Sequence, residues 1–169
     1  ACAFSRELGA KTIIAIDIEQ NRLELAREFG ADYIINPNEE KDIINKIKEI
    51  TENRGADYVI EVAGTPDVIN DGIKFLRIGG TYILLGAIYP GNNFTVDSSE
   101  IITKCINISG RHNYDAIHLK NAINIVQKSK EKFPYEKIVG PIFEFSKEGL
   151  EDAFNSLNSK KSLRPVIIP

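Results

Sequence analysis

The stretch Thr12-Ile13-Ile14-Ala15-Ile16-Asp17 is an apolar, largely β-branched run that ends in an acid. A run of this length and composition predicts a buried strand over 12–16. Residues 20–29 then carry apolar side chains at roughly helical spacing, and Gly30 ends the pattern. A second short apolar run, over 33–35, completes a strand–helix–strand unit. Such a unit predicts two parallel strands joined by a helix.

The rest of the chain repeats this alternation of short apolar runs and amphipathic stretches. The predicted strands are nearly continuous in hydrophobicity, which is typical of parallel strands buried on both faces. Alternation at these lengths predicts an α/β fold with a doubly wound, mostly parallel sheet. Further strands are expected over 57–62, 81–85, 107–109, 142–145 and 166–168, and further helices over 39–53, 66–76, 116–128 and near 149–157.

The composition is that of an ordinary globular protein. Of the 169 residues, 43% are hydrophobic and 27% are charged, which is enough for a substantial core. The 21 basic and 24 acidic residues give a net charge of −3, so nucleic acid is not an expected partner. The longest apolar runs are strand-sized, and no membrane span is expected. Two cysteines are too few for a disulfide framework and no leader is visible, so we expect a reducing, cytoplasmic location.

Asp17 is the most informative single residue, because it stands at the carboxyl end of a strand, where doubly wound sheets bind ligands. In dinucleotide-binding folds an acid at this place accepts hydrogen bonds from the adenosine ribose, about 20 residues after a glycine-rich phosphate loop. Counting back places that loop at or before residue 1. We therefore expect the first strand to be missing, with 12–16 and 57–61 not hydrogen-bonded to each other. The alternative interpretation is that Asp17 is only a polar strand end.

Two glycine-containing stretches follow later strands. One is 57–64 (DYVIEVAG), and the other runs over 76–87 and includes LRIGGT and LLGA. A strand followed directly by small residues lets a flat ring or a sugar approach the backbone closely. The alternative is that these glycines are ordinary turn residues.

Four stretches in order, GAKTIIAID, RLELAREFGAD, GADYVIEVAG and LRIGGTYILLG, resemble the medium-chain dehydrogenase/reductase superfamily. Within it, the sequence is similar to the zinc-dependent alcohol and polyol dehydrogenases, and the likeness extends to the closing 161–166 (KSLRPV). The resemblance implies a Rossmann domain over 1–113, incomplete at its N-terminus, and a hinge helix with a return segment over 114–169. It also implies NAD as cofactor, an alcohol or polyol as substrate, and a homodimer or homotetramer with edge pairing near 81–85.

The resemblance implies roles for particular residues. Asp17 matches the acid that binds the adenosine ribose and selects NAD over NADP, and Arg22 matches a basic residue beside the same ribose. Two segments match backbone that meets the nicotinamide end of the cofactor, namely Leu85, Gly86 and Ala87, and Arg111, His112 and Asn113. Arg164 matches a basic residue that contacts the pyrophosphate. The family's zinc ligands and proton relay come from an N-terminal domain. No catalytic or metal-binding residue is therefore expected here, and the chain alone is expected to be inactive.

Soft metal ligands are scarce, because the two cysteines and two histidines lack the paired spacing of zinc sites. Two alternative functions stay open. One is a zinc-independent quinone or enoyl reductase of the same superfamily, which usually prefers NADPH; the acid at Asp17 argues against it. The other is an NAD-sensing Rossmann domain without chemistry, or a related methyltransferase. The segment 116–169 argues against that class, because it resembles the dehydrogenases' return path.

Overall fold

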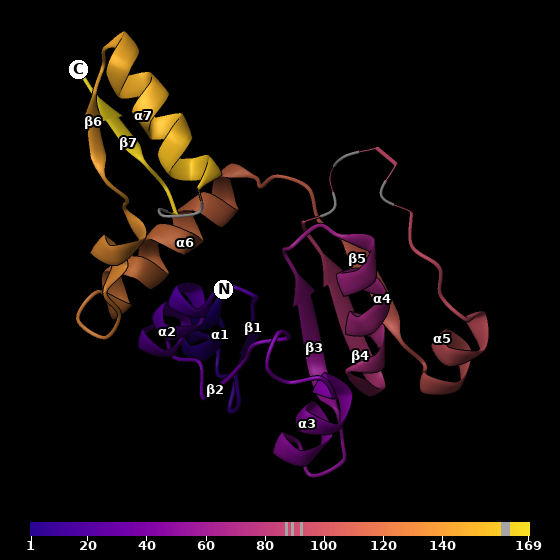
Figure 1. The fold of residues 1–169 in the computed structure, drawn as a ribbon. Helices are drawn as coiled ribbons and strands as arrows, with labels where there is room; N and C mark the ends of the chain where they lie inside the picture. Colours follow the sequence, from indigo (N-terminus) through magenta and orange to yellow (C-terminus); the bar gives the residue numbers. More distant parts are fainter. Residues whose placement is uncertain (87, 89, 92, 160–162) are drawn as a thin grey trace. The chain divides into compact units, whose positions relative to one another are not determined.

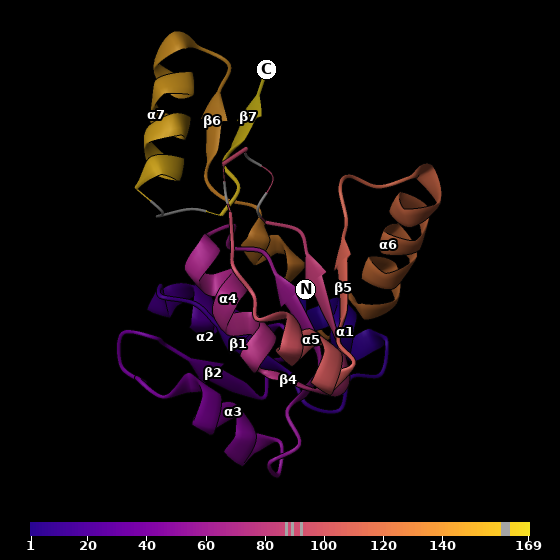
Figure 2. The same ribbon diagram turned by 90° about the vertical axis from the view of Figure 1, so that its right-hand side faces the viewer.

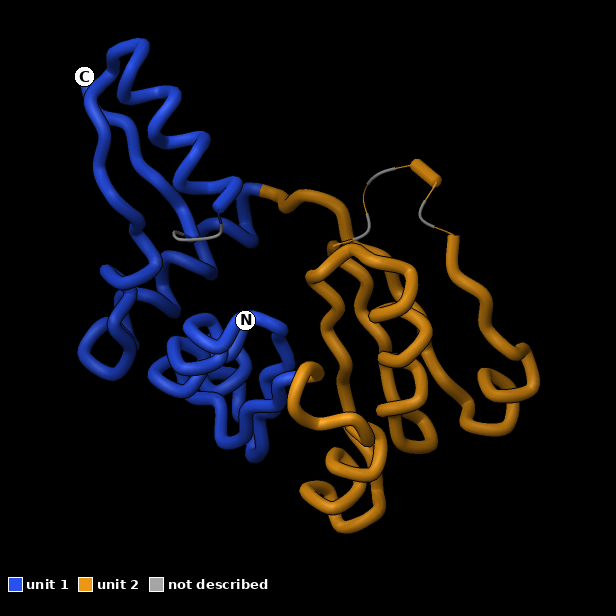
Figure 3. Tube along the Cα trace, viewed as in Figure 1, with its two compact units in different colours: residues 1–36, 116–169 blue, residues 37–115 orange. Residues whose placement is uncertain are grey.

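The computed structural model describes residues 1–86, 88, 90–91, 93–159 and 163–169. The chain divides into two compact units (Figure 3), a first unit of residues 1–36 and 116–169 and a second unit of residues 37–115. Every ladder between described strands is parallel, as predicted. Strands and helices alternate along the chain, so the predicted α/β class is confirmed.

The first unit contains two separate strand pairs, β1 with β2 and β6 with β7. Part of its core is aromatic: the rings of Phe29 and Phe133 are stacked with centroids 6.2 Å apart, and Tyr135 meets Phe29 edge-on at 5.6 Å. The elements of this unit (Figure 1) are α1 (Cys2–Glu7), β1 (Ile14–Ile16), α2 (Gln20–Glu28), β2 (Tyr33–Ile35), α6 (Ala116–Ser129), the 3₁₀ helix η1 (Tyr135–Ile138), β6 (Ile142–Glu144), α7 (Lys147–Asn158) and β7 (Val166–Ile168).

The second unit contains one three-stranded sheet, in the order β3-β4-β5. The helices α4 and α5 pack against this sheet (Figure 2). The elements of this unit are α3 (Ile43–Ile50), β3 (Ala56–Glu61), α4 (Pro66–Lys74), β4 (Leu76–Leu84), α5 (Ser98–Lys104) and β5 (Asn107–Gly110).

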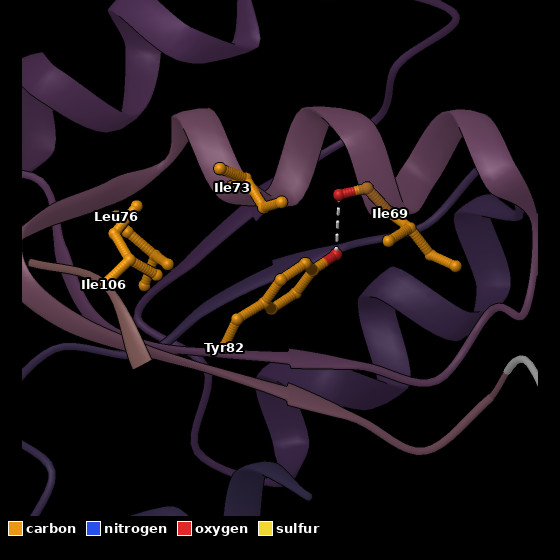
Figure 4. Packing of buried hydrophobic residues seen from close by; sticks show 5 residues of the cluster. All are labelled: Ile69, Ile73, Leu76, Tyr82 and Ile106. Carbon is orange, nitrogen blue, oxygen red and sulfur yellow. Dashed lines mark hydrogen bonds between the residues drawn. The ribbon is translucent and has the colours of Figure 1, made fainter. Parts of the chain in front are cut away.

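Tyr82 stands at the centre of the second unit's core (Figure 4), packed with Ile69, Ile73, Leu76 and Ile106. Its ring is fully buried, and its hydroxyl donates to the carbonyl oxygen of Ile69 at 3.1 Å. Burial raises the pKa of this hydroxyl, and nearby acids raise it further, so it stays a neutral donor. The helix α4 can lie this close to Tyr82 because residue 72 is a glycine. A Cβ at that position would lie 2.2 Å from the tyrosine hydroxyl oxygen.

The prediction that the strands are buried on both faces is wrong for β3. Val59 packs against the core under α4, but Tyr58 is 67% exposed and Ile60 is 39% exposed. Side chains alternate along a strand, so these two point to the opposite face. The core cluster of the second unit lies on one face only, and the other face of β3 keeps its apolar residues exposed.

Local capping explains two differences between the predicted and observed helices. The helix expected over 39–53 begins at Ile43, because the Asp42 carboxylate accepts the N–H of Asn45 at 3.1 Å and caps it. The helix α5 is absent from the sequence-based prediction. Its signal is Asp97, whose carboxylate accepts the N–H of Ser99 at 2.8 Å as an N-cap.

The strand β4 is longer than the strand expected over 81–85. It begins at Leu76 and runs through Gly79-Gly80. Its register against β3 shifts between Ala56 and Tyr58, and Gly79 takes a φ of +72°, which only glycine adopts readily. The glycine pair Gly79-Gly80 therefore lies inside a strand, and neither glycine belongs to a turn after it.

The strands β1 and β3 belong to different sheets, and no ladder joins them among the described residues. That these two strands are not hydrogen-bonded to each other stays a prediction. No helix in the described ranges combines the length and the apolar character that crossing a membrane requires.

Candidate functional site

The strand that carries Asp17 is held in place by a contact between Arg6 and Asp32. The Arg6 guanidinium donates to Asp32 Oδ2 at 2.6 Å and to three backbone carbonyl oxygens at 2.7, 2.8 and 3.0 Å. The same Asp32 oxygen accepts the N–H of Ile13 at 2.7 Å, directly before β1. Burial disfavours the charged carboxylate, but the bonds from Ile13 and Arg6 outweigh it and hold the pKa of Asp32 below its ordinary value. The entrance to β1 is thereby fixed.

Asp17 follows β1 directly, at the carboxyl end of the strand. Its backbone N–H donates to the carbonyl of Ile35 at 3.3 Å and so extends the pairing with β2. Its Oδ1 accepts the N–H of Glu19 at 2.9 Å, at the start of α2. Because the backbone holds one carboxylate oxygen and the side chain is 33% exposed, Oδ2 can accept a hydrogen bond from a ligand.

Arg22, in the first turn of α2, lies beside this carboxylate. Its Nη1 is 3.9 Å from Asp17 Oδ2, which is a loose ion pair of small energetic value. Its Nε is buried and has no hydrogen-bond partner among the described residues. The carboxyl end of β1 thus offers an oriented acceptor with a cation next to it, a combination that suits a sugar hydroxyl near a negatively charged group.

The loops after β3 and β4 meet at the carboxyl edge of the three-stranded sheet. The N–H groups of Leu85 and Gly86 donate to the carbonyl of Glu61 at 3.0 and 3.2 Å. A Cβ at Gly86 would lie 2.6 Å from both Gly64 N and Val62 C, closer than any side chain tolerates. Gly86 is therefore required by the close approach of two backbones, and not by a turn conformation.

Arg111 lies next to this edge, because its N–H donates to the carbonyl of Leu84 at 3.0 Å and continues the β4-β5 ladder. The structure thereby brings the predicted segments 85–86 and 111–113 to neighbouring strand ends. The Arg111 guanidinium bonds to Ser109 Oγ at 2.6 Å and to the carbonyl of Gly110 at 2.9 Å.

The other predicted residues divide between the two units. His112 and Asn113 are exposed, and Asn113 has a φ of +56°. Arg164 lies in the first unit, exposed and two residues before β7, where its carbonyl accepts the N–H of Gly140 at 2.7 Å. Ala87 lies outside the described residues.

Glu61 is a residue that sequence analysis does not single out. It ends β3, its side chain is 2% exposed, and its carboxylate accepts the N–H of Gly64 through Oε1 and that of Gly86 through Oε2, the second at 3.3 Å. The signal was available, because an acid at the carboxyl end of an apolar strand is the same pattern that identifies Asp17.

A metal centre does not fit the residues that the structure describes. No group of three or more His, Cys, Asp or Glu among them could hold a metal ion. Cys2 and Cys105 are free thiols.

Comparison with known proteins identifies the family. Residues 1–128 match the family model described as zinc-binding dehydrogenase. The chain belongs to the zinc-binding dehydrogenase family. It is 33% identical to D-xylulose reductase A of Aspergillus oryzae, in an alignment that covers 98% of this chain and 46% of that protein. It is 36% identical to L-threonine 3-dehydrogenase of Pyrococcus horikoshii over 65% of this chain and 32% of that protein. The family predicted by resemblance is confirmed.

Solved structures agree with this assignment of family and fold. An alcohol dehydrogenase from Thermotoga maritima superposes with a TM-score of 0.91 at 26% identity, over 99% of this chain and 46% of that one. Benzyl alcohol dehydrogenase from Acinetobacter calcoaceticus superposes with a TM-score of 0.87 at 28% identity, over 99% and 45%. The predicted Rossmann fold of this dehydrogenase family is confirmed. The chain spans less than half the length of each of these relatives.

Proposed function

We propose that this chain is the NAD-binding part of a zinc-containing alcohol or polyol dehydrogenase. The observation that carries the proposal is Asp17, an oriented and partly exposed carboxylate at the carboxyl end of β1. Membership of the zinc-binding dehydrogenase family supports it. The names of two relatives, a D-xylulose reductase and an L-threonine 3-dehydrogenase, support a reaction that interconverts a hydroxyl and a carbonyl group.

The residues of this chain bind and orient the cofactor. Asp17 Oδ2 accepts hydrogen bonds from the 2′- and 3′-hydroxyls of the adenosine ribose, with Arg22 beside it. The backbone of 85–87 and of 111–113 meets the nicotinamide end, and Arg164 reaches the pyrophosphate. When bound, the nicotinamide ring takes up or releases a hydride, which is chemistry that protein side chains do not supply.

The same carboxylate favours NAD over NADP. A 2′-phosphate at the ribose would place a second negative charge within a few Å of Asp17. At an effective dielectric constant near 20, that repulsion is on the order of several kcal/mol before screening by salt. Arg22, with its Nη1 3.9 Å from Asp17 Oδ2, offsets part of that repulsion. The balance supports NAD as the cofactor.

The rest of the proposal concerns the whole enzyme. We place the cofactor domain at 1–113 and the hinge helix and return segment at 114–169. The substrate is a secondary alcohol or a polyol, and zinc is held by residues outside this chain. The two free thiols fit a reducing cytoplasm, and the enzyme is a homodimer or homotetramer.

Calorimetric titration of the intact enzyme with NAD tests this function. Asp17→Asn keeps the shape of the side chain but removes its charge, and should weaken NAD binding about 10- to 100-fold, as expected for lost hydrogen bonds to a charged acceptor. Asp152→Asn, the same change on the exposed face of α7, is the matched control and should leave the affinity unchanged. Equal affinities of wild type and Asp17→Asn would contradict the assignment.

A further inference from the structure

Glu61 is the one acidic or basic residue classed as buried in the part of the chain that the structure describes. A buried charge is costly unless hydrogen bonds replace the lost water. Here they do: the two carboxylate oxygens accept the backbone N–H groups of Gly64 and Gly86, one from each of the loops that follow β3 and β4. The acid therefore joins two strand ends that the chain separates by more than twenty residues.

The two hydrogen bonds of the Glu61 carboxylate form a bridge between two loops whose backbones lie very close together. The carbonyl of Glu61 accepts the N–H groups of Leu85 and Gly86, so the main chain and the side chain of one residue hold the same loop. The glycine at 86 lies so close to residues 62–64 that no Cβ fits between the two loops. A change in the side chain of Glu61 removes its hydrogen bond to Gly86 and leaves only the main-chain bonds to position residues 85–86.

We propose that Glu61 is a positioning residue for the nicotinamide end of the cofactor, because its buried carboxylate helps to hold the loop at Leu85 and Gly86. The inference rests on the proposed function, which assigns NAD to this chain, and adds to it a residue that does not touch the cofactor. Glutamine at this position has one oxygen and one NH₂ group, so it satisfies one N–H and turns a donor toward the other. The loop should then shift while the strand stays in place.

The test compares NAD with ADP-ribose, which has the same adenosine end but no nicotinamide ring. In the intact enzyme, Glu61→Gln should weaken NAD binding about tenfold, because the shifted loop no longer meets the nicotinamide correctly, and change ADP-ribose binding less than twofold. A merely structural role would move both affinities together. Asp57→Asn is the matched control, because it is an acid-to-amide change at the opposite end of β3, where Asp57 bonds to Arg77. Asp57→Asn should lower stability, but it should change the affinities for NAD and ADP-ribose by the same factor.

Equal changes in NAD and ADP-ribose affinity, or no change in either, would overturn the positioning role of Glu61. Failure of the wild type to bind either ligand would instead overturn the proposed function, and this inference with it. If Glu61→Gln does not fold, Glu61→Asp replaces it, because aspartate keeps both oxygens on a shorter stem. NAD affinity should then again fall more than ADP-ribose affinity, by a smaller factor than in Glu61→Gln. Equal changes in the two affinities would again overturn the inference.

Discussion

Asp17 and Glu61 are both acids at the carboxyl end of an apolar strand, but their carboxylates differ in exposure and in hydrogen bonding. Asp17 is 33% exposed, and the backbone holds only one of its oxygens. Glu61 is 2% exposed, and both of its oxygens bond to backbone N–H groups of neighbouring loops. We propose that the first acid meets a ligand and that the second positions the loops around that ligand. Position in the sequence pattern does not distinguish these roles, but burial does.

The difference predicts different kinds of failure. Changes near Asp17 should alter which cofactor is accepted, because NAD and NADP differ only at the adenosine ribose. Changes at the edge formed by residues 61–64 and 85–86 should affect both cofactors equally, because their nicotinamide ends are identical. The ratio of kcat/KM for NAD to that for NADP is therefore the quantity that separates the two regions.

The largest effect is expected from the double variant Asp17→Ser, Ile18→Arg. It removes the repulsive carboxylate and supplies a guanidinium that can grip a 2′-phosphate bidentately. Wild type should favour NAD at least about a hundredfold, which corresponds to roughly 2.7 kcal/mol, and the variant should narrow or reverse that preference. Steady-state kinetics with both cofactors measure it, mostly through the Michaelis constant. An unchanged ratio would mean that Asp17 is only a solvated strand end.

An intermediate effect is expected from Gly86→Ala. The added methyl would lie 2.6 Å from backbone atoms of residues 62–64, so the two loops must separate. Because these loops position the nicotinamide end, their separation should raise the Michaelis constant for NAD about tenfold. The NAD-to-NADP ratio should stay at the wild-type value. A change in that ratio would show that the two regions are not separable in the way we describe.

A smaller effect is expected at Asp32, which supports the Asp17 region by holding the backbone directly before β1. Asp32→Asn removes the charged acceptor for Arg6 and Ile13 and should lower the free energy of unfolding by about 1 kcal/mol at neutral pH. The folded-state pKa of Asp32 lies below its ordinary value, so its contribution is present above about pH 4 and is lost as the pH falls through the folded pKa. Denaturant unfolding at a series of pH values should show the two proteins converging in acid. A constant difference would contradict this pH linkage.

The smallest effect is expected from Arg22→Gln. The pair with Asp17 is loose and partly exposed, so it contributes between zero and about 1 kcal/mol. Loss of the guanidinium should therefore change the Michaelis constant for NAD less than about fivefold. A much larger loss would show that Arg22 contacts the cofactor directly, and would move the centre of this region from the acid to the arginine.

The comparison also shows what sequence can and cannot predict. The apolar run before Asp17 and the alternation of elements indicated a parallel α/β fold, because periodicity and strand ends are local properties. The burial of Glu61 depends on loops that meet only in the folded chain. The role of Gly86 likewise depends on residues 62–64, although the sequence pattern had already drawn attention to that glycine. The helix α5 was missed despite a capping residue, Asp97, that local pattern alone could have revealed.

A crystal structure of the intact enzyme with NAD tests the central claim most directly. We predict Asp17 Oδ2 within about 3 Å of the adenosine ribose hydroxyls, with Oδ1 still bonded to the N–H of Glu19. We also predict the backbone of Leu85 and Gly86 beside the nicotinamide amide, with the Glu61 carboxylate bridge intact behind it. An adenosine ribose bound away from the carboxyl end of β1, with Asp17 facing solvent, would contradict the account.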